Sequence, residues 1–502
     1  MVNKEGTLSR PARWRIASLL FVHLLIAAHI IHWRLAGTTL ASIQLSDAGR
    51  FAAEGVATAA FFFFASLLVI TAIFGRFFCA WGCHMLALQE LCRLLLRRLG
   101  IRPQLLRSRA LWLVPFGAAF YAFFQPAVER LWQGVPFPAA TVALTSDQLW
   151  AHLPGAAEGI AAVLIGGLMM VYLLGSLSFC KYVCPYGALF ASADNLALGR
   201  IRLSGDCDGC AKCTAACTTG VRVHEEVLRL GMVANSGCMR CLECVSACSR
   251  DVLHYRFGRP ALLAGSRAGL TRYGFSRGEE GLLLLFFGTT FVAVHGIYDA
   301  IPLLLALAAS TLVAYLGVVA VRLVRLPFVS VRGTALRASG RLSYAGMAFS
   351  VAVAVLVLLL AHSLLIQFHN WRAGSELDAL GFPRVQATYS SDEQQRAQAA
   401  AAHLGFCTDY GLVDTVDWNM KLAWLARLLA QPQLVEKHLR RAITLDPTQA
   451  AAHFNLGKEL ARQERRAEAA EAFREAVRLA PALREHVPTG SGRGVGAGVG
   501  VR

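Results

Sequence analysis

The stretch CMRCLECVSAC, residues 238–248, decides the fold of the insert in which it lies, because it places four cysteines in one short loop. A second copy of the same spacing, CDGCAKCTAAC, occupies residues 207–217. CxxCxxCxxxC lets a turning loop direct three thiolates at one 4Fe-4S cluster and the fourth at its neighbour. We therefore expect two clusters, with ligand sets Cys207, Cys210, Cys213 and Cys248, and Cys238, Cys241, Cys244 and Cys217.

A pair of zinc sites is the alternative for these eight cysteines. Zinc motifs commonly pair CxxC units across a longer gap and use histidine freely, so this alternative is disfavoured. Both copies depart from the usual run, since Thr218 and Ser249 stand where a proline commonly follows the last cysteine. That proline shapes the turn, so its replacement bears on the cluster potentials more than on cluster binding.

The composition predicts a polytopic membrane protein, because 56% of the 502 residues are hydrophobic and only 16% are charged. A net charge of +17 fits cytoplasmic loops that contact anionic lipid better than a nucleic-acid interface, which we do not expect. A spanning helix needs about 20 apolar residues. Seven segments qualify, near residues 15–33, 56–74, 110–126, 159–179, 280–298, 301–321 and 345–367. The first has no cleavage site and is read as a retained helix.

Lysine and arginine collect in alternate loops, which predicts the orientation of the chain. Basic residues near the N-terminus, at 93–109 and in the cysteine-rich insert place these parts in the cytoplasm. With seven spans, everything after about residue 368 lies on the other side of an inner membrane, in the periplasm.

The predicted fold class is an all-α polytopic membrane protein with a ferredoxin-like α+β insert for two clusters and an α-helical tail. The expected divisions are membrane helices at 1–179, the cluster domain at 180–265, membrane helices at 280–368, a soluble helical domain at 369–486 and a disordered tail at 487–502.

Two further cysteine pairs lie at the expected inner ends of spans two and four. Cys79 and Cys83 belong to RFFCAWGCHMLALQELC, and Cys180 and Cys184 to FCKYVCPYGALF. The four thiols could exchange between dithiol and disulfide, hold a third cluster or a copper ion, act locally beside the clusters, or only pack. Cys92 and Cys407 are isolated and are expected to pack in the core.

These motifs give the chain a resemblance to membrane-bound polyferredoxins. It rests on CAWGCH, CKYVCPYG and the two CxxCxxCxxxC runs, within about residues 55 to 260. Related proteins include the membrane quinol-dehydrogenase subunit of periplasmic nitrate reductase, the nitrous-oxide reductase regulatory protein and copper-reducing accessory proteins of cytochrome oxidase. The resemblance implies electron transfer between a quinone pool, or a ferredoxin or flavoprotein donor, and an acceptor. His84 departs from the family pattern, which has proline after the second cysteine.

Histidines within the spans are the remaining candidates for chemistry, because ionisable groups are costly in a bilayer. His29, His32, His295 and His362 could take the proton of a quinol or ligate haem b, and His23 and His369 lie on the same spans. Interfacial histidines bonded to nearby backbone are the simpler alternative.

The tail is predicted to form tetratricopeptide-like helices. In AAHFNLGKELARQERRAEAAEAFREAVRLAP, small and apolar residues fall at the repeat's positions, and Pro447 precedes Pro481 by one repeat length. Such helix pairs usually bind a partner protein, and a capping role is the alternative.

Together these patterns predict an iron-sulfur electron-transfer protein that links the quinone pool or a cytoplasmic donor to a partner redox protein, with a quinol-dehydrogenase component as one form of that role. A copper reductase or assembly factor for a respiratory enzyme, and a redox-sensing scaffold, are the alternatives. The sequence contains no Rossmann fingerprint placed after a strand and no P-loop.

Overall fold

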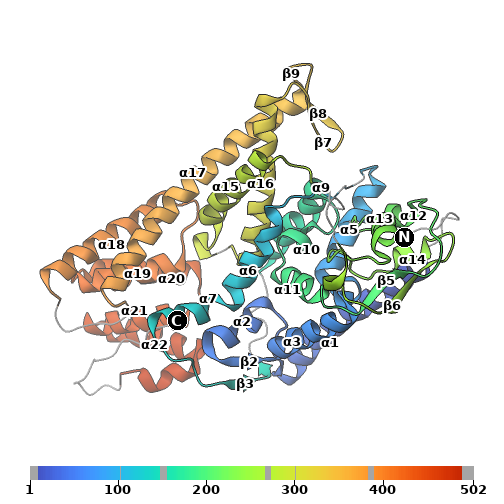
Figure 1. Cartoon of the computed structure of the whole chain (residues 1–502). Helices are drawn as coiled ribbons and strands as arrows, with labels where there is room; N and C mark the ends of the chain where they lie inside the picture. The colour runs from blue at the N-terminus through green and yellow to red at the C-terminus, as the bar shows by residue number, and fades with distance from the viewer. Residues whose placement is uncertain are drawn as a thin grey trace. The chain divides into compact units, whose positions relative to one another are not determined.

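The computed structural model describes residues 9–101, 103, 105–146, 155–265, 273–299, 301–382 and 389–488. Two compact units make up the chain, one of residues 1–291 and 303–353 and the other of residues 292–302 and 354–502 (Figure 1). Most of the tail predicted to be disordered lies outside the described residues.

Four described helices are long and apolar enough to cross a membrane. They are α1 (Arg10–Ala36), the continuous helix Ala156–Leu174, α16 (Leu303–Arg325) and α17 (Tyr344–Ala379). All four coincide with segments that the sequence predicts. Only 6% of the most apolar window of α1 is buried in the protein, as expected for a helix surrounded by lipid.

The predicted third span is a bent pair. Helices Leu111–Phe123 and Gln125–Gln133 (α7) meet at 53°. Pro126 stands at the start of α7, where proline has no N–H to continue the preceding helix and clashes with its last turn. Counted as one span, the pair raises the described total to five.

The other two predicted spans form helices that fall outside this criterion. Residues near 56–74 form α3 (Ala59–Phe74), which has 16 residues. Residues near 280–298 form α15 (Arg277–Val294), whose first turn carries Glu279 and Glu280. The membrane character is supported, and the count of seven stays a prediction.

Glycine lets the fourth span pack closely against α5 (His84–Arg98). The span is α8 (Ala156–Ala161), a π-helical stretch (Ala162–Met169) and α9 (Met170–Leu174). The buried amide of Gln89 donates to the carbonyl oxygen of Gly166 at 3.2 Å. A Cβ on Gly167 would lie 3.2 Å from the sulfur of Cys92, and Cys92 is buried in this contact as expected for a packing residue.

Short elements complete the first unit. The helices are α2 (Leu45–Glu54), α4 (Phe77–Trp81), η1 (Leu111–Leu113), α6 (Val114–Phe123), α10 (Ser178–Tyr182), α11 (Pro185–Asp194) and η4 (Ala261–Leu263). The strands pair as β1 (Thr39–Leu40) with β4 (Thr145–Ser146), β2 (Val56–Thr58) with β3 (Thr141–Ala143), and β7 (Val329–Val331) with β8 (Thr334–Ala338) and β9 (Arg341–Leu342). The main core gathers apolar residues of η1, α9, α10 and α16.

The cysteine-rich insert contains both helices and strands. Strands β5 (Gly199–Leu203) and β6 (Leu253–Phe257) are antiparallel, with Ile201 opposite Tyr255. Between them lie α12 (Lys212–Ala216), α13 (Val223–Leu230) and α14 (Glu243–Ser246). One sheet ladder therefore joins the two ends of a segment that carries both cysteine loops.

The second unit is helical, with η5 (Ile297–Asp299), the later part of α17, α18 (Ser391–Tyr410), α19 (Val416–Leu428), α20 (Pro432–Leu445), α21 (Ala450–Arg462), α22 (Arg466–Leu479) and η6 (Pro481–His486). Gly457 of α21 faces Phe473 of α22 so closely that a Cβ would lie 2.8 Å from the ring. This small-against-aromatic packing is what the tetratricopeptide pattern predicts. Cys407 is fully buried beside α17, as expected.

Candidate functional site

The two cysteine loops of the insert share one backbone conformation. Positive φ angles occur at Gly209, Ala211 and Gly220 in the first loop and at Arg240, Leu242 and Asp251 in the second. These are equivalent positions in the two copies. Four of the six are not glycine, and left-handed backbone costs such residues about 1 kcal/mol or more. The repeat therefore imposes a specific turn around each set of thiols.

The hydrogen bonds repeat as well. Thr214 donates its N–H to Ala211 O at 3.0 Å, as Val245 does to Leu242 O at 3.1 Å. The amide of Cys248 donates to Val245 O at 3.2 Å, and that of Cys217 donates to Thr214 O over the same distance. Two loops of one geometry, each with sulfur at matching positions, fit the chemistry of a pair of iron-sulfur clusters.

The structure brings the thiols of the second predicted set together. Cys217, Cys238, Cys241 and Cys244 interact electrostatically with one another. Burial, reinforced by Cys217, raises the pKa of Cys241 to about 12. Ligation therefore has to release a proton that this site otherwise retains.

The first predicted set is more open. Cys207 lies beside Cys213, and Cys248 packs against the core that contains Cys213, whereas Cys210 is exposed. In the described part of the chain, no three Cys, His, Asp or Glu side chains are arranged to hold one metal ion. The ligand assignments therefore stay predictions, supported by the repeated loop geometry.

The helix-end cysteines form a second structural repeat. Each motif follows a glycine of positive φ, Gly75 or Gly175, then places one cysteine in a five-residue helix, α4 or α10. The second cysteine, Cys83 or Cys184, is the extended N-cap residue just before the next helix, α5 or α11. Both CxxxC motifs are therefore built in the same way.

All four helix-end thiols converge. Each of the six pairs formed by Cys79, Cys83, Cys180 and Cys184 interacts electrostatically. The guanidinium of Arg76 faces the same group and lies 3.9 Å from the sulfur of Cys79. We call this group the four-cysteine centre. Four thiols and one cation suit a centre that gathers negative charge on sulfur.

A buried aspartate fixes that centre to the insert. Asp194, at the end of α11, accepts from the Arg76 backbone N–H at 3.2 Å and pairs with Arg240 at 2.8 Å and with Arg200 at 3.2 Å. Asp194, Arg200 and Arg240 have no exposed side-chain surface. Arg240 stands between Cys238 and Cys241, so one carboxylate links both cysteine systems.

Direct contacts strengthen the same link. The indole N–H of Trp81 donates to Arg240 O at 3.1 Å. Cys79, Cys180 and Cys241 belong to a single buried apolar cluster. The sequence shows these cysteines as separate motifs, and the structure makes the four-cysteine centre the neighbour of the second predicted cluster.

The predicted histidines fall in two different units of the chain. His32 bonds Thr39 Oγ1 at 3.2 Å, and His29 lies on the same helix in the first unit. His295 and His362 belong to the second unit, where His362 Nε2 bonds Tyr410 O at 2.9 Å. Their quinol and haem roles stay predictions.

Two histidine contacts were missed from the sequence. His84 interacts electrostatically with His23 of α1. His369 Nδ1 lies 2.9 Å from His403 Nδ1. Neither pair has a local sequence signal, because the partners come from separate helices.

Comparison with known proteins supports the iron-sulfur interpretation. A 4Fe-4S binding domain family matches residues 56–102 and 158–203, which contain the two CxxxC repeats and not the insert's loops. The tetratricopeptide repeat family matches residues 450–483. The resemblance to membrane-bound ferredoxin-type proteins is thus confirmed.

Three known proteins are similar to parts of this chain. Protein NirI of Paracoccus denitrificans is 27% identical over 49% of this chain and 36% of its own length. The ferredoxin-type protein NapH of Haemophilus influenzae is 26% identical over 38% of this chain and 66% of its own. The methylamine utilization ferredoxin-type protein MauN of Methylobacillus flagellatus is 24% identical over 28% of this chain and 48% of its own length. The chain thus spans between about a third and two-thirds of these relatives.

Proposed function

We propose that this ferredoxin-type 4Fe-4S membrane protein carries electrons between the quinone pool and a partner redox protein through three iron-sulfur centres. Two are the predicted clusters of the insert. The third is the four-cysteine centre, whose segments match a 4Fe-4S binding domain. Each cluster would supply one-electron transfer.

The convergence of Cys79, Cys83, Cys180 and Cys184 is the observation that carries this proposal. Four thiols are the number that one 4Fe-4S cluster requires. Arg76 offsets their negative charge, and Ser236 O holds its guanidinium through a 2.9 Å hydrogen bond. Because Ser236 lies just before Cys238, the cation that faces the four-cysteine centre is positioned by the loop of the second cluster.

A hollow beside α1 suits the quinone. It has a volume of about 560 Å³ and lies between α1, the CAWGC motif and the second cluster loop. Its apolar lining includes Trp14, Phe21, Trp81 and Leu242. Leu242 follows Cys241, so a ring held here would lie near a cluster ligand. Apolar lining, membrane-helix location and this proximity favour a lipid-soluble redox ring as the occupant.

The remaining predictions complete the proposal. The insert would face the cytoplasm of an inner membrane crossed by seven spans, and the tetratricopeptide-like unit would bind the partner redox protein from the periplasm. Helix pairs of this repeat class commonly present a binding surface, which supports a partner-binding role. Orientation can be checked with fusions placed after residues 265 and 488.

Iron analysis and electron paramagnetic resonance on the anaerobically purified protein test the proposal. We expect about 12 iron atoms per chain, against about 8 for two clusters alone, and reduction of clusters by a menaquinol analogue. The Cys180→Ser variant should lose about 4 iron atoms and keep the insert's signals, whereas Cys92→Ser should lose none. The metal-reductase alternative would replace this proposal if the wild type and Cys180→Ser both contained about 8 iron atoms per chain and only Cys180→Ser lost copper reduction.

A further inference from the structure

A second cavity lies where the insert meets the membrane helices. It has a volume of about 460 Å³ and is bounded by α5, the segment before η1, and the turn that follows α12. Cys217, Thr218 and Gly220 contribute one wall. This volume falls within the range of small-molecule binding sites.

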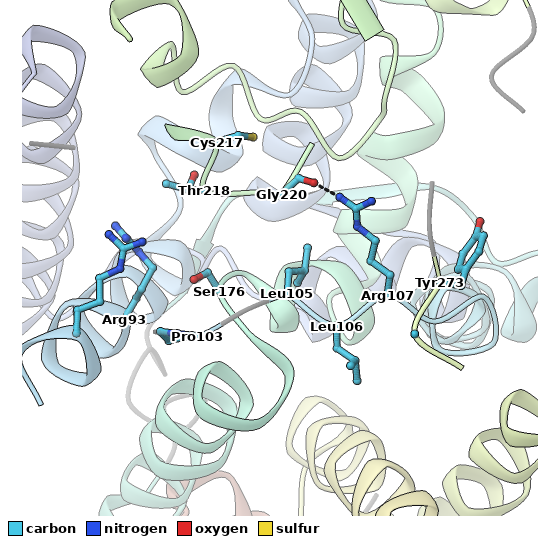
Figure 2. A pocket seen from close by; sticks show the side chains of 12 residues that line it. Arg93, Pro103, Leu105, Leu106, Arg107, Ser176, Cys217, Thr218, Gly220 and Tyr273 are labelled. Carbon is cyan, nitrogen blue, oxygen red and sulfur yellow. Dashed lines mark hydrogen bonds between the residues drawn. The ribbon is translucent and has the colours of Figure 1, made fainter. Parts of the chain in front are cut away.

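The lining of this cavity is strongly basic. Arg93, Arg97 and Arg107 line it, and its described lining contains no aspartate or glutamate. Figure 2 shows Arg93 and Arg107 on opposite sides, with Ser176 and Thr218 between them. The guanidinium groups and hydroxyls therefore surround one space, which is the arrangement an anion needs.

Among the lining arginines, Arg93 is held in a buried ion-pair network. Glu90 pairs with Arg93 and also with Arg15, at 3.2 Å, and Arg15 lies 3.9 Å from Glu243. Arg107 donates to Gly220 O, which fixes its side chain at the cavity.

We propose that this cavity binds a phosphate group. Arginine matches phosphate through paired N–H donors and stays charged at every physiological pH. The cavity includes Ser176, two residues beyond the end of the candidate span Ala156–Leu174. That position is the expected depth of lipid headgroups, so an anionic phospholipid and a soluble phosphate compound are the two sources of the same chemistry.

Occupancy would affect the redox chemistry, and this consequence rests on the proposed function. Cys217 lines the cavity and is a predicted ligand of the second cluster. A negative phosphate beside that thiolate would disfavour the added electron of the reduced cluster. Bound phosphate should therefore lower the reduction potential of this cluster.

Native mass spectrometry of the delipidated full chain tests binding without reference to the clusters. We expect retention of phosphatidylglycerol over phosphatidylcholine, with affinity reduced about fivefold in both Arg107→Gln and Arg97→Gln. Arg97→Gln is the second variant because Arg107 also bonds the insert. Arg341→Gln, an exposed arginine of β9, is the matched control and should bind normally.

Inorganic phosphate distinguishes the sources. Broadening of its phosphorus resonance by the wild-type protein, lost in both cavity variants, would identify a soluble phosphate ligand. Lipid retention without such broadening would identify a headgroup. Equal binding by wild type, both variants and the control, or no binding of either probe, would overturn the proposal.

A redox titration then separates this inference from the proposed function. In nanodiscs, phosphatidylglycerol should lower the potential of one cluster relative to phosphatidylcholine, and the Arg107→Gln variant should lose this difference. Specific lipid binding with no cluster signal would refute the proposed function alone. Normal cluster signals with no variant-sensitive binding would refute the phosphate site alone.

Discussion

The indole N–H of Trp81 donates to the carbonyl oxygen of Arg240 at 3.1 Å. This bond joins the CAWGC motif at a helix end to the loop that carries Cys238 and Cys241. It also turns the carbonyl of Arg240, a residue with φ of 55°, toward a donor inside the protein. The contact thus connects the two cysteine systems and stabilises a strained turn between cluster ligands.

Replacing Trp81 with phenylalanine should weaken this connection. The lost hydrogen bond should lower the free energy of unfolding by about 1 kcal/mol and slow electron transfer between the four-cysteine centre and the insert, with iron content unchanged. Freeze-quench paramagnetic resonance after a menaquinol pulse measures the order of cluster reduction. Trp112→Phe, at a half-exposed indole, is the control. Identical kinetics in both variants would show that the Trp81 bond has no role in transfer.

Asp194→Asn should damage the insert more severely. The change leaves Arg200 and Arg240 buried without their carboxylate, and breaking such a pair costs about 3–5 kcal/mol. Iron content should fall together with the unfolding temperature, measured in detergent. Asp206→Asn, at an exposed residue, should keep both. A stable Asp194→Asn protein with full iron content would contradict the anchoring role of this aspartate.

The sequence predicts much of this organisation because its motifs are local. CxxCxxCxxxC reports on ligands within one turn, and a run of apolar residues reports on one helix. The approach of Cys79 to Cys180 is different, because it depends on how α4 and α10 pack across about a hundred residues. Two equal CxxxC motifs predict a shared location, and they leave a single centre as one of several alternatives.

The contacts of buried charged residues could not be predicted from local motifs either. Arg76 is a cation close to Cys79 in the sequence, whereas Asp194 carries no sequence signal, and only the fold places both between the cysteine systems. The described helices support four spans, or five with the bent pair, and the count of seven stays a prediction for physical reasons. Pro126 bends the third segment, and Glu279 and Glu280 at the start of α15 hold that end in polar contacts. A hydropathy profile alone predicts neither the bend at Pro126 nor the polar contacts of Glu279 and Glu280.

Acid should weaken the contact between α15 and α16. Hydrogen bonding to Arg322, at 2.5 Å, lowers the pKa of Glu279 to about 2 from an ordinary value of 4.5. The carboxylate therefore contributes stability above about pH 4.5, and this is lost as the pH falls toward 2. Because the pair is partly exposed, the contribution is about 1 kcal/mol. Glu279→Gln should lower the unfolding temperature at pH 7 and lower it less at pH 3, where part of the contribution is already lost.

A control for that prediction is Glu485→Gln, which alters an exposed residue of η6. It should leave the unfolding temperature unchanged at both pH values. If Glu279→Gln behaves like this control at pH 7, the ion pair with Arg322 adds nothing to stability.

Gly457→Ala should disrupt the tetratricopeptide-like helices. The new methyl group would lie 2.8 Å from the ring of Phe473, and overpacking of this kind costs about 1–3 kcal/mol. Hydrogen exchange in the full chain should therefore accelerate in α21 and α22. Gly405→Ala in α18 meets no atom within 4 Å and should slow exchange there, because alanine favours helix by about 1 kcal/mol. Equal exchange in wild type and Gly457→Ala would show that α21 and α22 tolerate a wider separation than the repeat requires.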